Sequence, residues 1–389
     1  MKIHVMFLRD HVLRTGGTTY MLETLPQLES AHIRSSVCVL ESPSSACDSL
    51  VRAGIPVDFL KHGKRDPRRF TDLDSVLRRR RPDILHLLGP KSFMRGRLLG
   101  LWHGIPTITH FHSMLSEPPW MRAAQRRLAR YTALGLAPSK ATADWAAQEY
   151  ALPRDQVRVL DYGFDAQSYD IQDATARLAI RREWGIPQDA PVIGLPGRVI
   201  IAQKGQDIMI KLMPRLLERI PGLVLMIIGE GPDLALCRRI AQHTGTPQSI
   251  VFTGYRHDIP RILSAVDIVV VPSIWEDAHP FVALEAAAAG RPVVGFRSGG
   301  LPEAIRHSET GIIVPKGDAD QLCTALIELF SNAELAQLLG KQGRIHARKF
   351  SFEKHVLQLT KIYQQLLLKQ TRMADTIGKR PASDSKEED

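Results

Sequence analysis

Two basic residues stand six positions apart in a loop bounded by glycines. Arg198 and Lys204 lie between Gly197 and Gly205, directly after the apolar run 192–197. An arginine and a lysine at that spacing can converge on a diphosphate and neutralise the charge that develops on a departing nucleotide. The alternative is a solvated basic turn, which is what most such pairs are. The position of the loop at the end of a predicted strand favours phosphate binding.

Three carboxylates form a second group. Glu276 and Asp277 lie in a loop, and Glu285 follows within an apolar helical stretch, 281–290. A carboxylate on such a helix is costly to bury unless it is paired or accepts hydrogen bonds from hydroxyl groups. The alternative places Glu285 on the solvent face. The neighbouring alanines predict a tightly packed helix, so we expect Glu285 to be buried.

Glycines mark further loops that are suited to anions. Gly16-Gly17 follows the first predicted strand, Gly299-Gly300 stands within SGGLPE, and Gly231 stands within GEGP. Glycines let backbone N–H groups approach a ligand, and a helix that begins there favours negative charge. The alternative for each is a simple tight turn. None of them forms a GxGxxG fingerprint, which disfavours a nicotinamide enzyme.

These loops belong to an alternation of short apolar runs and longer amphipathic stretches, which is typical of βαβ units with parallel sheets. The predicted strands are 2–8, 35–40, 83–88, 107–111, 133–138 and 158–163 in the first half, and 192–197, 223–229, 250–254, 268–273 and 292–296 in the second. Two such series predict an α/β protein with two Rossmann-like lobes facing each other across a cleft. Ligands of such sheets bind beyond the carboxyl ends of the strands, where the loops above lie.

The chain of 389 residues is long enough for two domains, which we place at 1–168 and 169–350. An amphipathic pattern predicts a helix over 351–370, and the polar composition of 371–389 predicts a disordered tail. Four cysteines without a CxxC pair predict reduced, buried thiols. The first apolar run is too short for a signal peptide, so we expect a cytoplasmic protein.

With these residues assembled, the chain resembles the retaining glycosyltransferase family 4, or group 1 glycosyltransferases. The resemblance runs from about residue 2 to 370 and rests on several motifs in order: the glycine pair 16–17, PDILH (82–86), the loop 197–205, IGEGP (228–232), the run 285–294 and SGGLPE (298–303). It implies the GT-B fold, with an acceptor-side first domain and a second domain that binds a nucleotide sugar. It also implies that the helix at 351–370 crosses back to brace the first domain.

The resemblance assigns roles by position in the second domain. Arg198 and Lys204 match the family's diphosphate-binding pair, and Glu285 matches the second glutamate of its E-x7-E motif, which binds the donor ribose. The first acidic position of that motif falls on Asp277, which would contact sugar hydroxyls, and Glu276 is its alternative.

Two further positions concern the donor sugar. His112 matches the family's histidine near the sugar, and His110 is its rival. The usual Gly-Phe-Gly after the first acidic residue reads Ala278-His279-Pro280, and a proline has no N–H to donate, which puts one sugar contact in question. The expected catalytic residues are His112, Arg198, Lys204 and Asp277, and the expected donor site comprises Gly16, Gly17, Arg198, Lys204, Gly231, Glu276, Asp277, Phe281, Val282, Glu285, Gly299 and Gly300.

The implied reaction transfers a hexose or N-acetylhexosamine from a nucleoside diphosphate sugar to a glycan or lipid-linked acceptor, with retention, in bacterial cell-surface polysaccharide or lipopolysaccharide synthesis. The resemblance implies no cofactor and no obligatory metal, and the Asp-x-Asp pairs at 72–74 and 318–320 lie outside the predicted donor loops. A nucleotide-sugar 2-epimerase of the same fold is the alternative enzyme, and an inactive donor-binding relative is another alternative. A basic nucleic-acid-binding protein is the non-enzymatic alternative, which an aromatic content of 6% disfavours.

The net charge of +10 arises locally. Residues 61–130 contain 16 Lys and Arg against 5 Asp and Glu, including the run RRRR. A basic surface on the acceptor side predicts contact with anionic lipid head groups or a phosphorylated lipid-linked glycan, and peripheral attachment to the inner face of the cytoplasmic membrane. The alternative is a solvated face that aids solubility. We expect no nucleic-acid partner.

Overall fold

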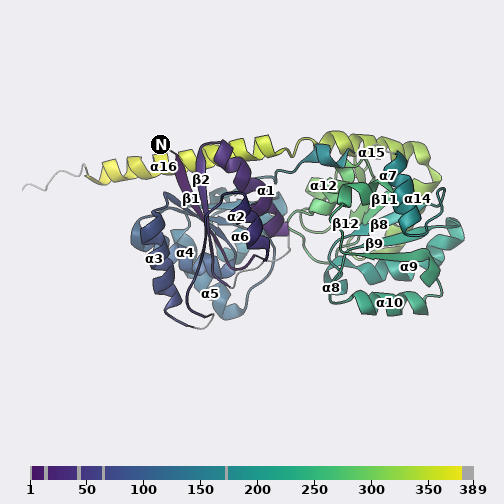
Figure 1. Ribbon diagram of the computed structural model, residues 1–389, viewed down its shortest axis with the longest axis horizontal. Coiled ribbons are helices and arrows are strands. Elements are labelled where there is room, and N and C mark those ends of the chain that lie inside the picture. Colours follow the sequence, from purple (N-terminus) through teal and green to yellow (C-terminus); the bar gives the residue numbers. More distant parts are fainter. Residues whose placement is uncertain (1, 13–15, 42–44, 64–65, 171–173, 379–389) are drawn as a thin grey trace, which may run out of the picture.

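The computed structural model describes residues 2–12, 16–41, 45–63, 66–170 and 174–378, and it folds into two lobes that lie side by side (Figure 1). Each lobe is built on one parallel sheet with helices on both faces. The first sheet has the order β3-β2-β1-β4-β5-β6-β7 and the second the order β10-β9-β8-β11-β12-β13. The predicted two-lobed α/β architecture of the GT-B type is confirmed.

The strands of the first sheet are β1 (Ile3–Arg9), β2 (Ile33–Val39), β3 (Val57–Phe59), β4 (Ile84–Leu88), β5 (Thr107–His110), β6 (Leu134–Ala137) and β7 (Val157–Val159). Those of the second are β8 (Val192–Pro196), β9 (Val224–Ile228), β10 (Ile250–Gly254), β11 (Ile268–Val271), β12 (Val293–Phe296) and β13 (Gly311–Val314). The central strands are apolar throughout because helices cover both faces. In β1, Val5 and Phe7 enter one core and Met6 and Leu8 enter the other.

The helices of the first lobe are α1 (Gly16–Ser30), α2 (Ser45–Arg52), α3 (Arg69–Arg80), α4 (Pro90–His103), α5 (Pro119–Leu128) and α6 (Lys140–Tyr150). Those that follow are α7 (Ala174–Glu183), α8 (Ile201–Lys204), α9 (Gln206–Arg219), α10 (Leu234–His243), α11 (Ile259–Ser264), α12 (Phe281–Ala288), α13 (Leu301–Ala304), α14 (Ala319–Ser331), α15 (Ala333–Ala347) and α16 (Phe352–Gly378). Because all strands are parallel, most helices begin at the carboxyl edge of their sheet, so the site loops of each lobe share one edge.

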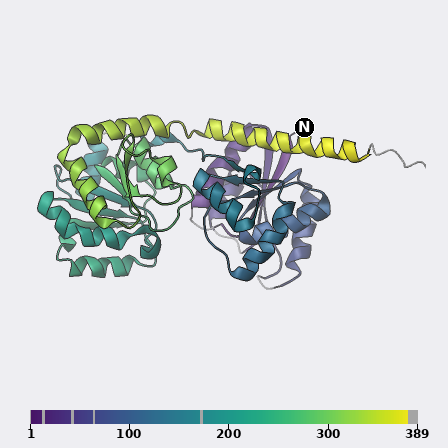
Figure 2. The ribbon, with the colours of Figure 1, turned by 180° about the vertical axis from the view of Figure 1, so that it is seen from behind.

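The last helix, α16, leaves the second lobe and runs along the first (Figures 1 and 2). Its residues Val356, Leu359 and Tyr363 are buried in the core that covers one face of the first sheet. The backbone N–H of Phe164 donates to the carbonyl of Phe350, where the two segments that connect the lobes meet. The two lobes are therefore tied together at these crossings.

Some predicted boundaries differ from the structure. Two strands were not predicted. β3 has three residues on an edge of the first sheet, and β13 has four, so neither is long enough to show the residue pattern that predicts a strand. Helix α16 continues to Gly378, whereas a tail was predicted from residue 371. The rest of that tail, 379–389, lies outside the described residues.

Two further features concern the state of the cysteines and the presence of helices that could span a membrane. All four cysteines are buried thiols. No single helix in the described chain combines the length and apolar character needed to cross a membrane; the stretches Ala319–Ser331 and Ala333–Thr371 reach that composition only when taken together, across a bend of 101°.

Candidate active site between the two lobes

Two glycines, one in the basic loop of the second lobe and one in a neighbouring loop, allow close backbone packing. The loop runs from Gly197, after β8, through α8 to Gly205, which has a φ of 64°. A Cβ on Gly205 would lie 2.3 Å from the carbonyl oxygen of Pro272, and one on Gly231 would lie 2.2 Å from that of Val199. The loops after β8, β9 and β11 are therefore packed backbone to backbone, which explains Gly231 sterically.

The predicted cation and carboxylate of this loop meet directly. The Lys204 Nζ lies 2.8 Å and 2.7 Å from the two carboxylate oxygens of Asp277, and both side chains are partly exposed. Arg198 is exposed and forms no side-chain hydrogen bond or ion pair within the described chain. One cation of the predicted diphosphate pair is thus available to a ligand, and the other is held by an acidic residue of the same site.

The loop 275–278 packs on the glycine pair of SGGLPE. The N–H of Gly300 donates to the Asp277 carbonyl at 2.8 Å, and that of Gly299 donates to the Glu276 carboxylate. A Cβ on Gly299 would lie 2.0 Å from the Asp277 carbonyl oxygen. The expected anion cradle therefore has both N–H groups occupied by this loop. Burial acts to raise the pKa of Glu276, but the ammonium of Lys316 and the Gly299 N–H outweigh it and lower that pKa.

Glu285 projects from α12, whose neighbouring alanines are buried, and is itself half-buried. The hydroxyl of Tyr169 donates to its carboxylate at 3.0 Å. Burial raises the pKa of Glu285 to about 7, and the Tyr169 hydrogen bond offsets this in part. Glu23, on α1 of the first lobe, is close enough for the charge of Glu285 to raise its pKa, after the larger effect of lost solvent. Sequence reasoning missed Glu23, because its position across the cleft depends on the lobe arrangement.

The two rival histidines of the first lobe have different environments. His110 is completely buried, and its Nδ1 lies 3.1 Å from Nε2 of His86. His112 is half-buried, with Nδ1 2.7 Å from the Tyr162 hydroxyl and with Nε2 lacking a partner among the described residues. Burial, followed by the positive charge of Arg9, lowers the pKa of His112 well below its usual value, so the ring is neutral. His110 belongs to the core, and His112 is the histidine that bonds Tyr162, whose ring contacts Phe281 of the second lobe.

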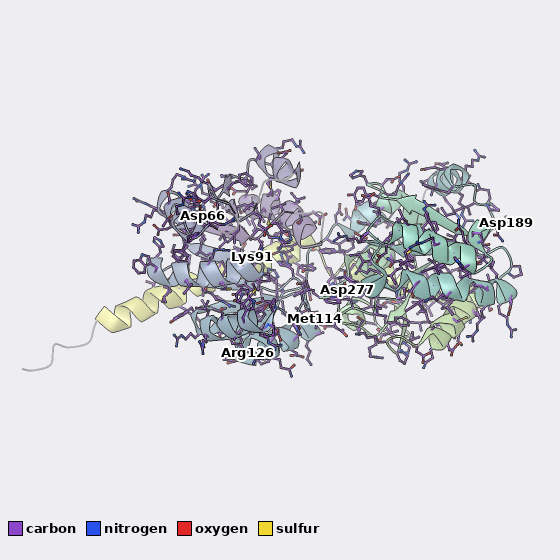
Figure 3. All side chains as sticks on the ribbon, turned by 90° about the horizontal axis from the view of Figure 1, so that it is seen from below. Asp66, Lys91, Met114, Arg126, Asp189 and Asp277 are labelled. Atoms are coloured by element: carbon purple, nitrogen blue, oxygen red, sulfur yellow. The ribbon has the colours of Figure 1, made fainter. Side chains whose placement is uncertain are left out.

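Contacts between the lobes bring His112 near the second lobe. The ring of Tyr162 stacks on Phe281 at 4.8 Å between centroids, with an interplanar angle of 7°. Figure 3 shows Met114, which follows His112, and Asp277 at the junction of the lobes. Val282, next to Phe281, packs against the core of the second lobe. The predicted residues of both lobes therefore converge on one junction.

A second set of contacts joins the lobes through polar groups that the sequence did not single out. The hydroxyls of Ser139 and Thr142 donate to the Ala278 carbonyl at 2.6 Å and 3.0 Å. The carboxylate of Glu303, in SGGLPE, accepts the N–H groups of Lys140 and Ala141 at 2.6 Å and 2.9 Å, at the start of α6. A carboxylate at that position caps the helix and complements its dipole.

The remaining predicted positions lie as follows. Gly16 and Gly17 form the first residues of α1, and residues 13–15 before them lie outside the described chain. Pro280 precedes α12, and its carbonyl accepts the N–H of Ala283. His279 beside it is buried with no partner for either ring nitrogen within the described residues, and burial lowers its pKa to about 4.

The Asp-x-Asp pairs make contacts outside the proposed donor site. Asp72 bonds His62, Asp74 bonds Arg78 and His103, Asp318 caps α14, and Asp320 pairs with Arg215. In the part of the chain that the structure describes, no group of three or more His, Cys, Asp or Glu side chains is arranged to hold a metal ion.

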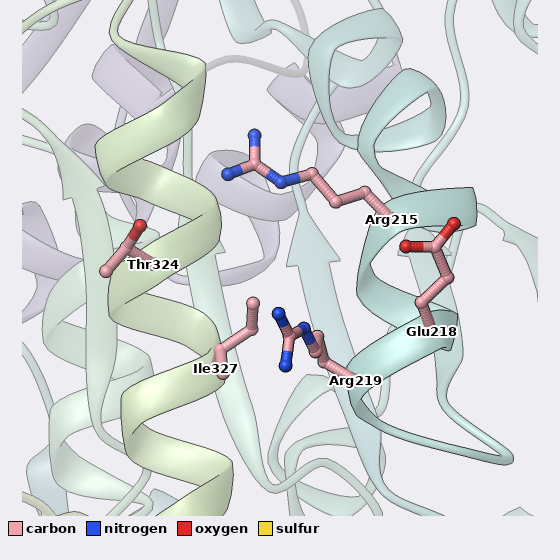
Figure 4. Close-up of a pocket in the computed structure, with 5 residues that line it drawn as sticks. All are labelled: Arg215, Glu218, Arg219, Thr324 and Ile327. Carbon is pink, nitrogen blue, oxygen red and sulfur yellow. The ribbon is translucent and has the colours of Figure 1, made fainter.

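A concavity elsewhere on the second lobe has no part in this site. It lies between α9 and α14 and is lined by Arg215, Glu218, Arg219, Thr324 and Ile327 (Figure 4). These residues stand on helix faces rather than at strand ends, and Arg215 is paired with Asp320. It contains none of the predicted site residues.

Comparison with known proteins agrees with this geometry. Residues 14–168 match the family described as Glycosyltransferase Family 4, and residues 190–332 match Glycosyl transferases group 1. The chain is 31% identical over 269 residues, 67% of its length and 68% of the relative's, to a GDP-mannose-dependent alpha-(1-6)-phosphatidylinositol monomannoside mannosyltransferase of Mycolicibacterium smegmatis. It is 32% identical over 219 residues, 54% of its length and 52% of the relative's, to a D-inositol 3-phosphate glycosyltransferase of Corynebacterium jeikeium.

Solved structures show the same fold. The Anabaena protein HepE in complex with UDP-glucose superposes with a TM-score of 0.82 at 19% identity, covering 93% of this chain and 100% of that one. WaaG, a glycosyltransferase involved in lipopolysaccharide biosynthesis, gives a TM-score of 0.70 at 14% identity, covering 93% and 99%. With the family matches, the relatives and the two-lobed architecture taken together, this chain belongs to glycosyltransferase family 4 and is a glycosyltransferase of the GT-B fold.

Proposed function

We propose that this glycosyltransferase moves a hexose or N-acetylhexosamine from a nucleoside diphosphate sugar to a glycan or lipid-linked acceptor, with retention of the anomeric configuration. The observation that carries the proposal is the Lys204–Asp277 pair in the same loop region as Arg198, whose side chain has no partner among the described residues. The mycobacterial relative depends on GDP-mannose by name, and HepE was solved with UDP-glucose, which supports a donor of this class. The two family descriptions lend no support to a 2-epimerase or a nucleic-acid-binding protein.

In the proposed reaction the donor diphosphate lies against Arg198 and Lys204, and Glu285 receives the ribose hydroxyls. The acceptor oxygen forms the new bond to the anomeric carbon on the face from which the diphosphate leaves. The acceptor proton passes to the departing phosphate oxygen, and the two cations stabilise the negative charge that develops there. The neutral ring of His112 lies on the sugar side. We propose that neither a cofactor nor a metal ion is required.

We further propose that the enzyme acts at the inner face of the cytoplasmic membrane, in bacterial cell-surface polysaccharide or lipopolysaccharide synthesis. Support comes from region 61–130, which combines an excess of basic residues with apolar side chains that have large exposed fractions: Leu101 56%, Trp102 78% and Trp120 65%. Such a mixture suits an anionic membrane surface. Co-sedimentation with anionic and neutral vesicles at low and high salt tests this, and equal binding to both vesicle types would contradict it.

The donor assignment is tested by thermal shift with UDP-glucose, UDP-N-acetylglucosamine and GDP-mannose. A bound donor at a hundred times its dissociation constant should add about 2.7 kcal/mol of stability. Arg198→Ala and Lys204→Ala should lose that shift, whereas Lys211→Ala, on an exposed surface pair with Asp207, should keep it. If no nucleotide sugar stabilises the protein, the proposed donor site is wrong.

A further inference from the structure

A cavity of about 260 Å³ opens on the first lobe where α3, α4 and α5 begin. Its lining includes the basic residues Arg69, Lys91 and Arg95 and the apolar residues Phe70, Leu98 and Trp120. The first turns of these helices lie at the carboxyl edge of the first sheet, the edge that also carries His112. Figure 3 places Lys91 between Asp66, in the outer part of the lobe, and the junction marked by Asp277.

Arg69 is the unusual member of this cavity. Its side chain is buried, with 4% of the residue exposed, yet the guanidinium forms no hydrogen bond or ion pair in the described chain, and its Nε is enclosed without a partner. A buried charge without a partner destabilises a protein, so such groups are normally paired. An anion bound in the cavity would provide the missing partner.

Arg95 adds a second unpaired guanidinium. No hydrogen bond or ion pair of its side chain is found among the described residues. Burial first, and then the positive charge of Arg69, lower its pKa, and the carboxylates of Asp10 and Glu41 offset this in part. Lys91 is paired with Glu41 at 2.5 Å, so that pair contributes little net charge. The cavity therefore holds two guanidinium groups without a hydrogen-bonding partner among the described residues, and an anion bound between them would reduce their mutual repulsion. Phosphate suits this arrangement, because guanidinium groups bind its oxygens through paired, charge-assisted hydrogen bonds.

The apolar residues of the lining extend the cavity along one face of α4. Lys91, Arg95, Leu98 and Trp102 follow one another along one face of α4, with the charged pair nearest the sheet edge and the exposed apolar pair farther away. At 1.5 Å per residue this face is about 16 Å long from Lys91 to Trp102. An amphiphile with its phosphate at Arg69 and Arg95 would lay its hydrocarbon chain along Leu98 and Trp102, away from the site.

We propose that this cavity binds the phosphate of a lipid-linked acceptor, with Arg69 and Arg95 as its ligands and with the α4 face as the path of the lipid chain. The proposal rests on the proposed function and names the chemistry of its acceptor. The basic region then has a specific role, because it orients a phosphorylated lipid so that the sugar-accepting end of the lipid reaches the junction beside His112.

Soluble hexyl phosphate and inorganic phosphate serve as probes in calorimetric titrations of the full chain. Hexyl phosphate should bind wild type and Arg127→Gln, a control that removes the same charge from an exposed position on α5. Arg69→Gln and Arg95→Gln should each weaken it about tenfold or more, the expected effect of losing a hydrogen bond to a charged group. Vesicles of phosphatidylcholine with added polyprenyl phosphate should retain wild type at high salt, and plain vesicles should not.

Thermal unfolding of the ligand-free variants separates this role from a structural one. If Arg69 is held for a ligand, Arg69→Met should melt no lower than wild type, because the change removes an unpaired buried charge. A clear drop in its melting temperature would indicate a structural role and overturn the proposal, as would hexyl phosphate binding that is unchanged in Arg69→Gln. Equal affinity for inorganic and hexyl phosphate would exclude the lipid. Since the donor panel is measured separately, failure here with intact donor binding leaves the proposed function standing.

Discussion

The Nδ1 of His112 lies 2.7 Å from the hydroxyl of Tyr162, whose ring stacks in turn on Phe281 of the second lobe. The hydrogen bond holds the imidazole ring of His112 in one orientation. The same tyrosine thus positions the cleft histidine of the first lobe and touches the helix that carries Glu285.

Tyr162→Phe should therefore reduce turnover about tenfold while leaving donor affinity within a factor of about two. The variant keeps the stacked ring but leaves Nδ1 of His112 enclosed without its partner, a loss of about 1–3 kcal/mol in a group that must keep one orientation. Steady-state rates with the donor found by thermal shift measure the effect.

Tyr150→Phe is the matched control, since the Tyr150 hydroxyl donates to Glu117 in the core of the first lobe, at 2.7 Å. It should lower stability without a selective effect on turnover. Equal losses of turnover in both variants would mean that Tyr162 acts only through stability.

The Lys204–Asp277 pair predicts opposite effects on two ligands. Asp277→Asn removes the carboxylate that holds Lys204, so the affinity for a nucleoside diphosphate without sugar should rise a few-fold. The same change removes the contact that we propose Asp277 makes to the sugar hydroxyls, so the nucleotide sugar should lose its advantage over the bare diphosphate. Calorimetry with both ligands measures the ratio, and Lys204→Ala should weaken both about tenfold. A parallel weakening of both ligands in Asp277→Asn would contradict this account.

Sequence patterns located the site loops because those features are local. A buried strand is a short apolar run and its carboxyl end is the next loop, so the positions of Arg198, Lys204, Asp277 and Glu285 could be predicted without any tertiary contact. The residues alone could not decide between His110 and His112, since both stand near one strand end, and only the family resemblance favoured His112. Burial against His86 separates them in the structure.

The contacts that join the lobes were missed for the same physical reason. Glu303 caps a helix that begins 163 residues earlier in the chain, and Ser139 donates to Ala278 across a similar separation. No periodicity or local motif encodes such a meeting, because it depends on how two folded lobes dock. The same holds for the pairing of Lys316 with Glu276.

Glu303→Gln should loosen the docking of the lobes. A neutral amide is a weaker acceptor for the N–H groups of Lys140 and Ala141 and loses the interaction with the dipole of α6, a loss of about 0.5–2 kcal/mol. Small-angle scattering should show a larger radius of gyration, and the catalytic efficiency should fall. Donor affinity, which we propose depends mainly on Arg198, Lys204 and Glu285 of the second lobe, should change little. Glu309→Gln, at an exposed pair with Arg306, is the control. An unchanged radius of gyration with unchanged efficiency would remove Glu303 from this role.

The raised pKa of Glu285 predicts how stability depends on pH. Its pKa is about 7 in the folded protein against an ordinary value of 4.5, so the folded state binds the proton more tightly than the unfolded state. The stabilisation this provides is complete below about pH 4.5 and is lost as the pH rises to about 7. Because the residue is half-buried, the loss should be about 1–3 kcal/mol rather than the full value of the shift.

Glu285→Gln mimics the protonated form, so its free energy of unfolding should exceed that of wild type above pH 7 and match it near pH 4.5. Denaturant titrations across this range measure both curves; parallel curves for the two proteins would show that the pKa of Glu285 is the same in the folded and unfolded states, and would contradict the raised pKa.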